Sequence, residues 1–390
     1  MTRQFTGYIE GYYGRLLDWR DRDRLIDRVV AAGMNSYFYA PKEDRYHRYY
    51  WRQPYDLTWQ QAFSKFSRRA AVKGIYVIAG IAPGLDFDFA SLDRADDAVG
   101  DFAVLVEKGR QLLKGGAKSI ALLMDDIAAD FDIRAGGFTS EGKAHAALTN
   151  RFGAALDAPV IMVPRIYADC LISADDPQSV NYLKDLTIDL EPLHKVVYCG
   201  EEIVAVRPGR DKGCYLDPAR VMIWDNFYAN DYCPRRLFLG PWRVANQPDI
   251  MLNLTGMIET DLLLLDLMAA AQDNADRNFG GRGTVASETA WREVISKKSV
   301  PEAFFDIAYY FDAPYGFDPH FPIPSPDDAL SALEVLLWCW KSPLQREWYA
   351  CLMGLKQDIL LANGQLPRER IEKTQLRPLA IQLGELAFKD

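Results

Sequence analysis

The stretch that decides the fold is Ser119-Ile120-Ala121-Leu122-Leu123-Met124-Asp125-Asp126-Ile127. Its apolar run ends abruptly in two adjacent carboxylates. Such a run predicts a β-strand that is buried on both faces, as in a parallel sheet. Asp125 and Asp126 then follow the strand where it leaves the core. In a parallel barrel, that edge is where active sites are built.

A β/α rhythm runs through the first 275 residues. The candidate strands are Thr6–Glu10, Asn35–Tyr39, Ile75–Ala79, Ile120–Met124, Val160–Val163, Val196–Cys199, Val221–Trp224 and Ile250–Asn253. The helical patterns between or after them are Asp18–Ala32, Trp59–Val72, Asp96–Leu113, Glu141–Leu156, Val180–Leu186 and Thr260–Ala271. Strands that alternate with helices predict an α/β fold, and eight such units predict a (β/α)8 TIM barrel. An open doubly wound sheet is the alternative, but Gly11-Tyr12-Tyr13-Gly14 lacks the glycine spacing of its phosphate-binding turn.

The rhythm stops after residue 275. A proline-rich connector leads into a helix that opens at Asp327 or Asp328, and a second helix is expected over Gln345–Ala362. We therefore predict a catalytic barrel domain over residues 1–275 and a C-terminal α-helical domain over residues 276–390. The tryptophans of the second part fit either a homodimer interface or packing on the barrel; they are Trp338, Trp340 and Trp348.

Composition narrows the possible partners. The formal net charge of −9 over 390 residues argues against a nucleic-acid surface. The first residues lack the apolar segment of a secretory signal, and the longest apolar runs are too short to span a bilayer. Six cysteines without CxxC spacing and four histidines without HxH or HExxH spacing argue against a zinc site. We expect no metal, no organic cofactor and a cytoplasmic location with reduced cysteines.

Polar and aromatic residues follow one predicted strand after another, so they are expected to meet at the barrel rim. They include Gly11, Lys42, Tyr167, Asn226 and Asn253, besides the two aspartates. Taken singly, each has an ordinary explanation: the aspartates could cap a helix or bind Mg²⁺ as a pair, and the others could satisfy loop backbone groups. Together, uncharged donors and aromatic faces around two acids suit a carbohydrate better than a phosphate or a nucleotide. Repulsion between the carboxylates would raise the pKa of one of them and favour a general acid.

Several segments resemble glycoside hydrolase family 84, the family of protein O-GlcNAcases and bacterial β-N-acetylglucosaminidases. The similarity covers about residues 5–260. The segments are Gly7–Arg15, Met34–Asp44, His47-Arg48 with Trp51-Arg52, Pro83–Asp86, Ala121–Ile127, Ile223–Tyr232 and Arg236–Pro241.

The resemblance implies a retaining exo-β-N-acetylglucosaminidase that acts on a GlcNAc-bearing glycoside or glycoprotein. The substrate's own 2-acetamido oxygen would attack the anomeric carbon and form an oxazoline, an exception to the scheme with two catalytic carboxylates. By similarity, Asp126 is the general acid and base, and Asp125 accepts the acetamido N–H. Tyr167 and Asn226 would steady the acetamido group. The ring hydroxyls would be held by the Gly11 backbone and by Lys42, Asp231 and Asn253.

The chain departs from the family pattern near the acetamido pocket. Pro164-Arg165-Ile166 replaces Pro-Thr-Glu, Tyr198-Cys199-Gly200 replaces Trp-Thr-Gly, and Leu254 follows Asn253 in place of proline. Leu16-Leu17 also replaces Pro-Trp after the first motif. These changes leave open a catalytically weakened barrel that only binds GlcNAc-modified proteins or glycans. The aspartate pair itself leaves open a Mg²⁺-dependent hydrolase that uses the two carboxylates as ligands. The natural substrate, the tolerated N-acyl size, an exo or endo preference and the oligomeric state also stay open.

Overall fold

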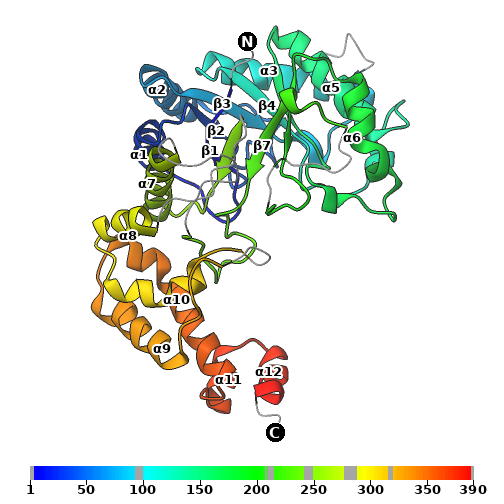
Figure 1. Cartoon of the computed structure of the whole chain (residues 1–390). Helices are drawn as coiled ribbons and strands as arrows, with labels where there is room; N and C mark the ends of the chain where they lie inside the picture. The colour runs from blue at the N-terminus through cyan, green and yellow to red at the C-terminus, as the bar shows by residue number, and fades with distance from the viewer. Residues whose placement is uncertain are drawn as a thin grey trace.

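The computed structural model describes residues 4–92, 100–206, 209, 215–240, 249–275, 288–314 and 319–387. Eight parallel strands close into a barrel in the order of the sequence, with helices around the outside (Figure 1). The strands are β1 (Gly7–Glu10), β2 (Ser36–Tyr39), β3 (Tyr76–Ile81), β4 (Ser119–Leu123), β5 (Val160–Val163), β6 (Lys195–Tyr198), β7 (Val221–Asp225) and β8 (Ile250–Asn253). The predicted (β/α)8 barrel is therefore confirmed. Each predicted strand lies within two residues of the observed one.

The barrel strands are buried on both faces, as the apolar runs predict. In β4, Ala121 and Leu123 point into the barrel and pack with Ile161, Val163 and Trp224. The alternate residues Ile120 and Leu122 belong to the larger core between the strands and the outer helices. Because side chains of a strand point alternately to opposite faces, one continuous apolar run serves both cores.

The outer helices begin where the sequence offers capping residues. Asp18 caps α1, Asp56 caps α2 and Ser140 caps α5, each with a side-chain oxygen that accepts a backbone N–H three residues later. The helices are α1 (Trp19–Ala31), α2 (Leu57–Val72), α3 (Asp101–Lys114), the short α4 (Phe131–Arg134), α5 (Glu141–Leu156), α6 (Pro177–Asp189) and α7 (Ile258–Ala275). The helix predicted over Asp96–Leu113 is observed as α3 from Asp101, because Gly100 has an extended conformation and is its N-cap. The predicted residues before it, up to 99, lie outside the described part of the chain. Between β6 and β8, the only helical element among the described residues is a 3₁₀ turn, Pro218–Arg220.

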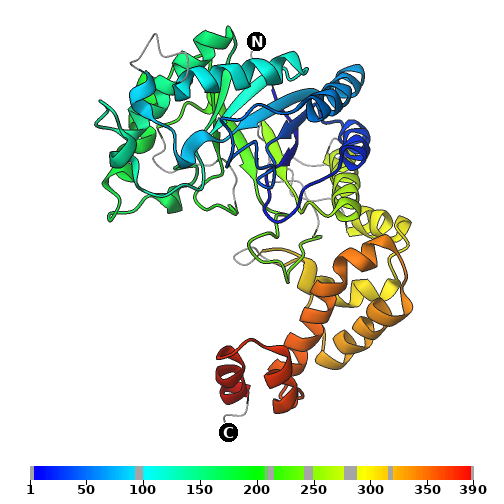
Figure 2. The ribbon, with the colours of Figure 1, turned by 180° about the vertical axis from the view of Figure 1, so that it is seen from behind.

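A second helical region continues away from the barrel (Figure 2). Its elements are α8 (Glu288–Lys297), a 3₁₀ helix (Glu302–Phe311), α9 (Pro326–Glu334) with a π turn (Val335–Cys339), α10 (Pro343–Ala362), α11 (Arg368–Thr374) and α12 (Leu379–Ala387). The predicted domain boundary at residues 275 and 276 coincides with the start of a segment, 276–287, outside the described residues. Trp340 and Trp348 are buried, whereas 48% of Trp338 is exposed. Among the helices described, none is both long and apolar enough to cross a bilayer.

The helical region contacts the loop that follows β7. The Leu239 backbone N–H donates to the Phe311 carbonyl at 2.7 Å, and the Trp291 indole donates to the Leu239 carbonyl at 2.6 Å. From α10, the Trp348 indole donates to the Thr260 hydroxyl at 3.0 Å. The C-terminal helices therefore support two segments that leave the carboxyl ends of barrel strands.

Candidate active site

A cavity of about 490 Å³ lies at the carboxyl ends of the barrel strands. The structure brings all eight predicted site residues to its wall: Gly11, Lys42, Asp125, Asp126, Tyr167, Asn226, Asp231 and Asn253. Three aromatic residues at the wall, Tyr13, Trp224 and Tyr232, were not predicted as site residues. The size is typical of a cavity for one small ligand.

Asp125 is a buried carboxylate with one satisfied oxygen. Only 6% of the residue is exposed, and its Oδ2 forms an ion pair with the Lys42 ammonium, which is also buried. Its Oδ1 is buried and has no hydrogen-bond partner among the described residues. A buried acceptor without a donor is costly, so this oxygen is suited to receive an N–H or O–H from a ligand.

Asp126 has a different environment. Its backbone adopts the left-handed conformation with φ of 52°, and 34% of its side chain is exposed. The Tyr13 hydroxyl donates to Oδ2 and the Tyr167 hydroxyl donates to Oδ1, both at 2.8 Å. The Lys42 Nζ lies 4.0 Å from Oδ2. The Lys42 ammonium thus lies close to both carboxylates, whereas the Tyr13 and Tyr167 hydroxyls bind only that of Asp126.

The expected rise in the pKa of one carboxyl through repulsion is not found at Asp126. Burial by itself raises the pKa of this carboxyl, but the Lys42 ammonium and the hydroxyls of Tyr167 and Tyr13 outweigh burial and hold it below its usual value. The prediction overlooked the cation between the two acids. Asp126 is therefore ionised at neutral pH.

Two asparagines and a tryptophan form a connected floor. The Asn226 Oδ1 accepts from the Trp224 indole at 2.9 Å and from the Asn253 amide at 3.0 Å. The Asn226 Nδ2 donates to the Ile203 carbonyl at 2.9 Å. Asn226 is thus fixed from three sides, and its two amide N–H donors are directed at the Ile203 carbonyl and, at 3.6 Å, the Cys199 Sγ, both in the segment that follows β6.

Gly11 has to be glycine because of Trp224. A Cβ on Gly11 would lie 2.2 Å from the Trp224 ring, which is far inside van der Waals contact. The Gly11 backbone N–H donates to the Asn253 Oδ1 at 3.3 Å. Two residues later, the Tyr13 N–H donates to the Asp231 Oδ2 at 2.9 Å. The segment after β1 is therefore tied to two other predicted site residues.

The Lys42 ammonium also bears on the Mg²⁺ alternative. It contacts Asp125 directly and approaches Asp126, so a cationic side chain already lies between the two carboxylates. A divalent cation bound by both acids would have to displace it. Within the described residues, no group of three or more His, Cys, Asp or Glu side chains has an arrangement that could hold a metal ion.

Sequence reasoning missed the role of Arg48. Its guanidinium donates to the backbone carbonyls of Asp125 and Asp126, and the residue is only 5% exposed. Arg48 belongs to a quoted family segment, but nothing in the sequence indicates that a residue after β2 reaches the backbone after β4. Tyr13 was not predicted as a site residue either, and only its contact with Asp126 reveals its place in the site.

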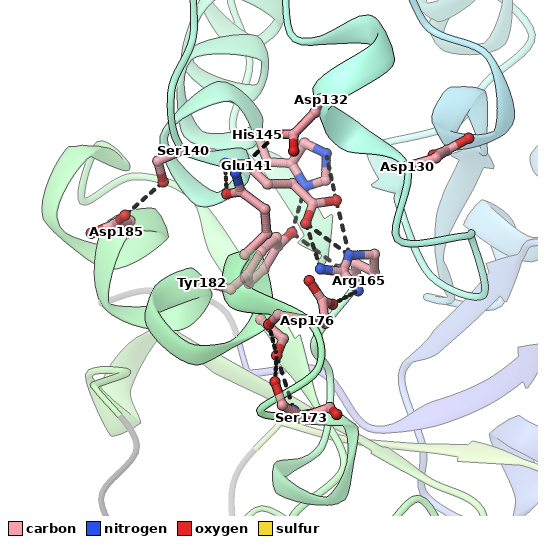
Figure 3. Close-up of polar contacts among 12 residues, drawn as sticks. Asp130, Asp132, Ser140, Glu141, His145, Arg165, Ser173, Asp176, Tyr182 and Asp185 are labelled. Atoms are coloured by element: carbon pink, nitrogen blue, oxygen red, sulfur yellow. Dashed lines mark hydrogen bonds and ion pairs between the residues drawn. The ribbon is translucent and has the colours of Figure 1, made fainter.

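The altered segment before Tyr167 turns away from the cavity. The Arg165 guanidinium pairs with Glu141 and Asp176 between α5 and α6 (Figure 3). By contrast, the altered Cys199 lines the cavity and lies 3.6 Å from the Asn226 amide nitrogen. The departure at Cys199 therefore changes the cavity wall, whereas the departure at Arg165 changes contacts behind the wall, between α5 and α6.

A parallel eight-stranded barrel with two acids in a cavity at the carboxyl ends of its strands defines a barrel enzyme. The family model of beta-N-acetylglucosaminidase matches residues 6–296. The chain therefore belongs to this family, glycoside hydrolase family 84, and is a glycoside hydrolase. It is 31% identical over 267 residues to protein O-GlcNAcase of Mus musculus and, equally, to that of Rattus norvegicus. The matched region covers 66% of this chain but only 28% of each relative, so the chain spans a minor part of their length.

Proposed function

We propose that the chain is a retaining exo-β-N-acetylglucosaminidase of the O-GlcNAcase type, which uses the substrate's own acetamido group as the nucleophile. The observation that carries the proposal is the unpaired, buried Oδ1 of Asp125 beside the ion pair with Lys42. A secondary amide N–H would satisfy that oxygen, and the substrate's 2-acetamido group supplies one. The family membership supports the same substrate class.

In the first step, the acetamido oxygen forms a bond to the anomeric carbon as the bond to the leaving oxygen breaks. Asp126 donates its proton to that leaving oxygen. Asp125 stays ionised and accepts the acetamido N–H, which becomes more acidic as positive charge develops on the oxazoline. Tyr167 and Asn226 steady the acetamido group, while Gly11, Lys42, Asp231 and Asn253 hold the ring hydroxyls.

In the second step, water attacks the anomeric carbon and gives its proton to Asp126. The bond between that carbon and the acetamido oxygen breaks, which restores the acetamide and yields a sugar with retained configuration. Two displacements on one carbon account for the retention.

The low pKa of Asp126 sets a condition on this mechanism, because a general acid must carry a proton. Substrate entry raises the pKa of Asp126 if the sugar displaces the Tyr13 hydroxyl from Oδ2 and excludes water, while Tyr167 keeps its contact with Oδ1. Burial, which already acts to raise the pKa, then dominates.

The test is hydrolysis of aryl β-GlcNAc glycosides by wild type, Asp125→Ala and Asp126→Ala. Wild type should release the aryl alcohol. Asp126→Ala should lose less activity on a substrate with a very good leaving group, because protonation matters less there. Asp125→Ala should stay impaired on both substrates. An inert wild type, or equal losses for both variants on both substrates, would contradict the proposal.

A second candidate is a weakened barrel that binds GlcNAc-modified proteins or glycans without turnover. The observation that favours it is the Asn226 amide, whose two N–H donors are directed at the Ile203 carbonyl and the Cys199 Sγ. Calorimetric binding of GlcNAc by a wild type that releases no aryl alcohol would support this candidate.

We also propose a cytoplasmic location for the protein, which cell fractionation tests. A homodimer is the oligomeric state that we propose, and analytical sedimentation tests it.

A further inference from the structure

We propose that Arg165 is a positioning residue: its paired contacts with Glu141 and Asp176 hold the segment that directs Tyr167 at Asp126. The inference deepens the proposed function and rests on it for the kinetic consequences. Arg165 itself turns away from the cavity and touches no reacting group, so its influence has to pass through Tyr167.

The side chain of Arg165 joins the start of two helices to the end of β5. Its Nε lies 2.9 and 2.8 Å from the two oxygens of Glu141, and its Nη2 lies 2.6 Å from the Glu141 Oε2. Its Nη1 lies 2.7 Å from the Asp176 Oδ2. Glu141 is the first residue of α5, and Asp176 is the N-cap of α6. Figure 3 shows the guanidinium between the two carboxylates.

The backbone of Arg165 is held by the same helices. Its N–H donates to the Tyr182 hydroxyl at 3.1 Å, and that hydroxyl also contacts the His145 Nδ1. Burial lowers the pKa of His145 to about 3, so its imidazole is neutral and can accept the hydroxyl proton. Both the main chain and the side chain of Arg165 are therefore fixed by α5 and α6.

The segment that joins Arg165 to Tyr167, the residue that contacts Asp126, is short and tightly packed. Ile166, the one residue between Arg165 and Tyr167, is 1% exposed. The Tyr167 carbonyl accepts from the Cys199 N–H at 2.7 Å, and its hydroxyl donates to the Asp126 Oδ1. A planar guanidinium that binds two carboxylates defines one geometry, whereas a lysine would act as a point charge.

The test is a double-mutant cycle with Arg165→Lys and Tyr167→Phe. In the wild-type background, Arg165→Lys should lower kcat/KM on an aryl β-GlcNAc glycoside by roughly tenfold to a hundredfold, as expected when a catalytic group is misplaced. In the Tyr167→Phe background, the same change should cost less than about threefold, because the hydroxyl through which it acts is gone. Equal losses in both backgrounds would overturn the proposal.

A second readout does not depend on turnover. The Asp126 carboxyl can be titrated by NMR with ¹³C-labelled aspartate, with Asp126→Asn to assign its signal. Five groups face or bind this residue, namely Lys42, Tyr13, Tyr167, Asp125 and Arg48, and only Tyr167 is anchored by Arg165. Arg165→Lys should raise the pKa of Asp126, because it weakens the Tyr167 hydrogen bond. If wild type is inert, the proposed function fails, yet this titration still decides the role of Arg165.

A matched control is the ion pair between Lys195 and Asp249, at 2.8 Å with 12% and 7% of the side chains exposed. It lies at the opposite end of the barrel, at the start of β6 and before β8. Lys195→Arg should change neither kcat/KM nor the Asp126 titration. If Arg165→Lys does not fold, Asp176→Asn keeps the Glu141 pair and should shift both readouts in the same direction by less. An unmoved Asp126 pKa in a folded variant would refute the positioning role.

Discussion

Arg48 donates from Nη2 to the backbone carbonyl oxygen of Asp126 at 2.6 Å, and its Nη1 lies 3.3 Å from the carbonyl oxygen of Asp125. The left-handed backbone of Asp126 is unfavourable for a residue with a side chain, by roughly 1–3 kcal/mol in such cases. Such a conformation persists only where its surroundings impose it. Arg48 is therefore the residue that holds the backbone of the acid pair in place.

Replacing Arg48 should impair activity more than folding. Arg48→Met removes both carbonyl contacts, so the Asp126 carboxyl should lose its fixed position, and kcat/KM should fall by roughly tenfold to a hundredfold. The exposed Arg45 provides the control, since the only side-chain hydrogen bond described for it goes to the Tyr46 hydroxyl. Arg45→Met should leave kcat/KM within about twofold of wild type. Unchanged activity in a folded Arg48→Met variant would refute the role given to Arg48.

Gly11→Ala should disturb the cavity floor. The added methyl would overlap the Trp224 ring, so the ring or the segment after β1 has to move, at a cost of about 1–3 kcal/mol in unfolding free energy. Because the Trp224 indole also holds Asn226, we expect kcat/KM to fall as well. Urea unfolding and hydrolysis kinetics measure the two effects.

The same substitution at Gly384 is its control. A Cβ there meets only Arg368 side-chain atoms, at 3.9 Å, and the residue lies inside α12. Gly384→Ala should be neutral or stabilise the protein by up to about 1 kcal/mol. Equal stability changes at both positions would show that the Trp224 ring does not restrict residue 11.

The buried Asp225 carboxyl should make the unfolding free energy depend on pH. Burial raises the pKa of this carboxyl to about 6, whereas an unfolded aspartate titrates near about 3.9. Between these values the folded state binds the extra proton, so Asp225 lowers the unfolding free energy as pH rises from about 4 to about 6. The difference of about two pKa units corresponds to roughly 3 kcal/mol.

Asp225→Asn should remove this dependence. The amide oxygen can still accept the Phe227 N–H, which lies 2.9 Å from the Asp225 Oδ1. Urea unfolding at several pH values should therefore show the variant gaining stability relative to wild type as pH rises through that window. The control Asp175→Asn, at an exposed position, should show no such pH-dependent change in stability relative to wild type. A constant difference between Asp225→Asn and wild type at all pH values would contradict a buried, titrating carboxyl.

The barrel could be predicted because its signal is local. Each strand is a short and mostly apolar run, and α1, α2 and α5 begin at capping side chains, so local sequence patterns predicted them. The 3₁₀ helix Glu302–Phe311 was not predicted, since its pattern of Phe and Tyr residues is not distinctive for that conformation. The α4 helix was missed because its four residues are too few to show a helical period.

The candidate site was predicted as a set of residues rather than as a network. All eight residues line one cavity because strand ends in a barrel converge. Pairing could not be read from the sequence: Lys42 and Asp125 are 83 positions apart. The low pKa of Asp126 depends on such contacts, and so does the role of Arg165, which a sequence reading classifies only as a departure from the family pattern.

Glu347 on α10 caps the first turn of α7 from outside. Its two carboxylate oxygens accept the backbone N–H groups of Glu259 at 3.0 Å and of Thr260 at 2.8 Å. The Thr260 hydroxyl donates to the same carboxylate at 2.7 Å. A carboxylate at a helix N-terminus satisfies free donors and interacts favourably with the helix dipole. The C-terminal helices thereby stabilise the helix that follows β8.

Glu347→Ala should therefore lower the unfolding free energy of the whole chain by about 1–3 kcal/mol, because three part-buried donors lose their acceptor. Glu347→Gln keeps an acceptor oxygen and should cost less, about 1 kcal/mol. Glu372, exposed and paired with Arg368 on α11, is the control, where alanine should cost under about 0.5 kcal/mol. Urea unfolding followed by circular dichroism measures the unfolding free energies of the three variants and so ranks them. If Glu347→Ala were no more destabilising than Glu372→Ala, the contact between α10 and α7 would contribute nothing to holding the barrel and the helical region together.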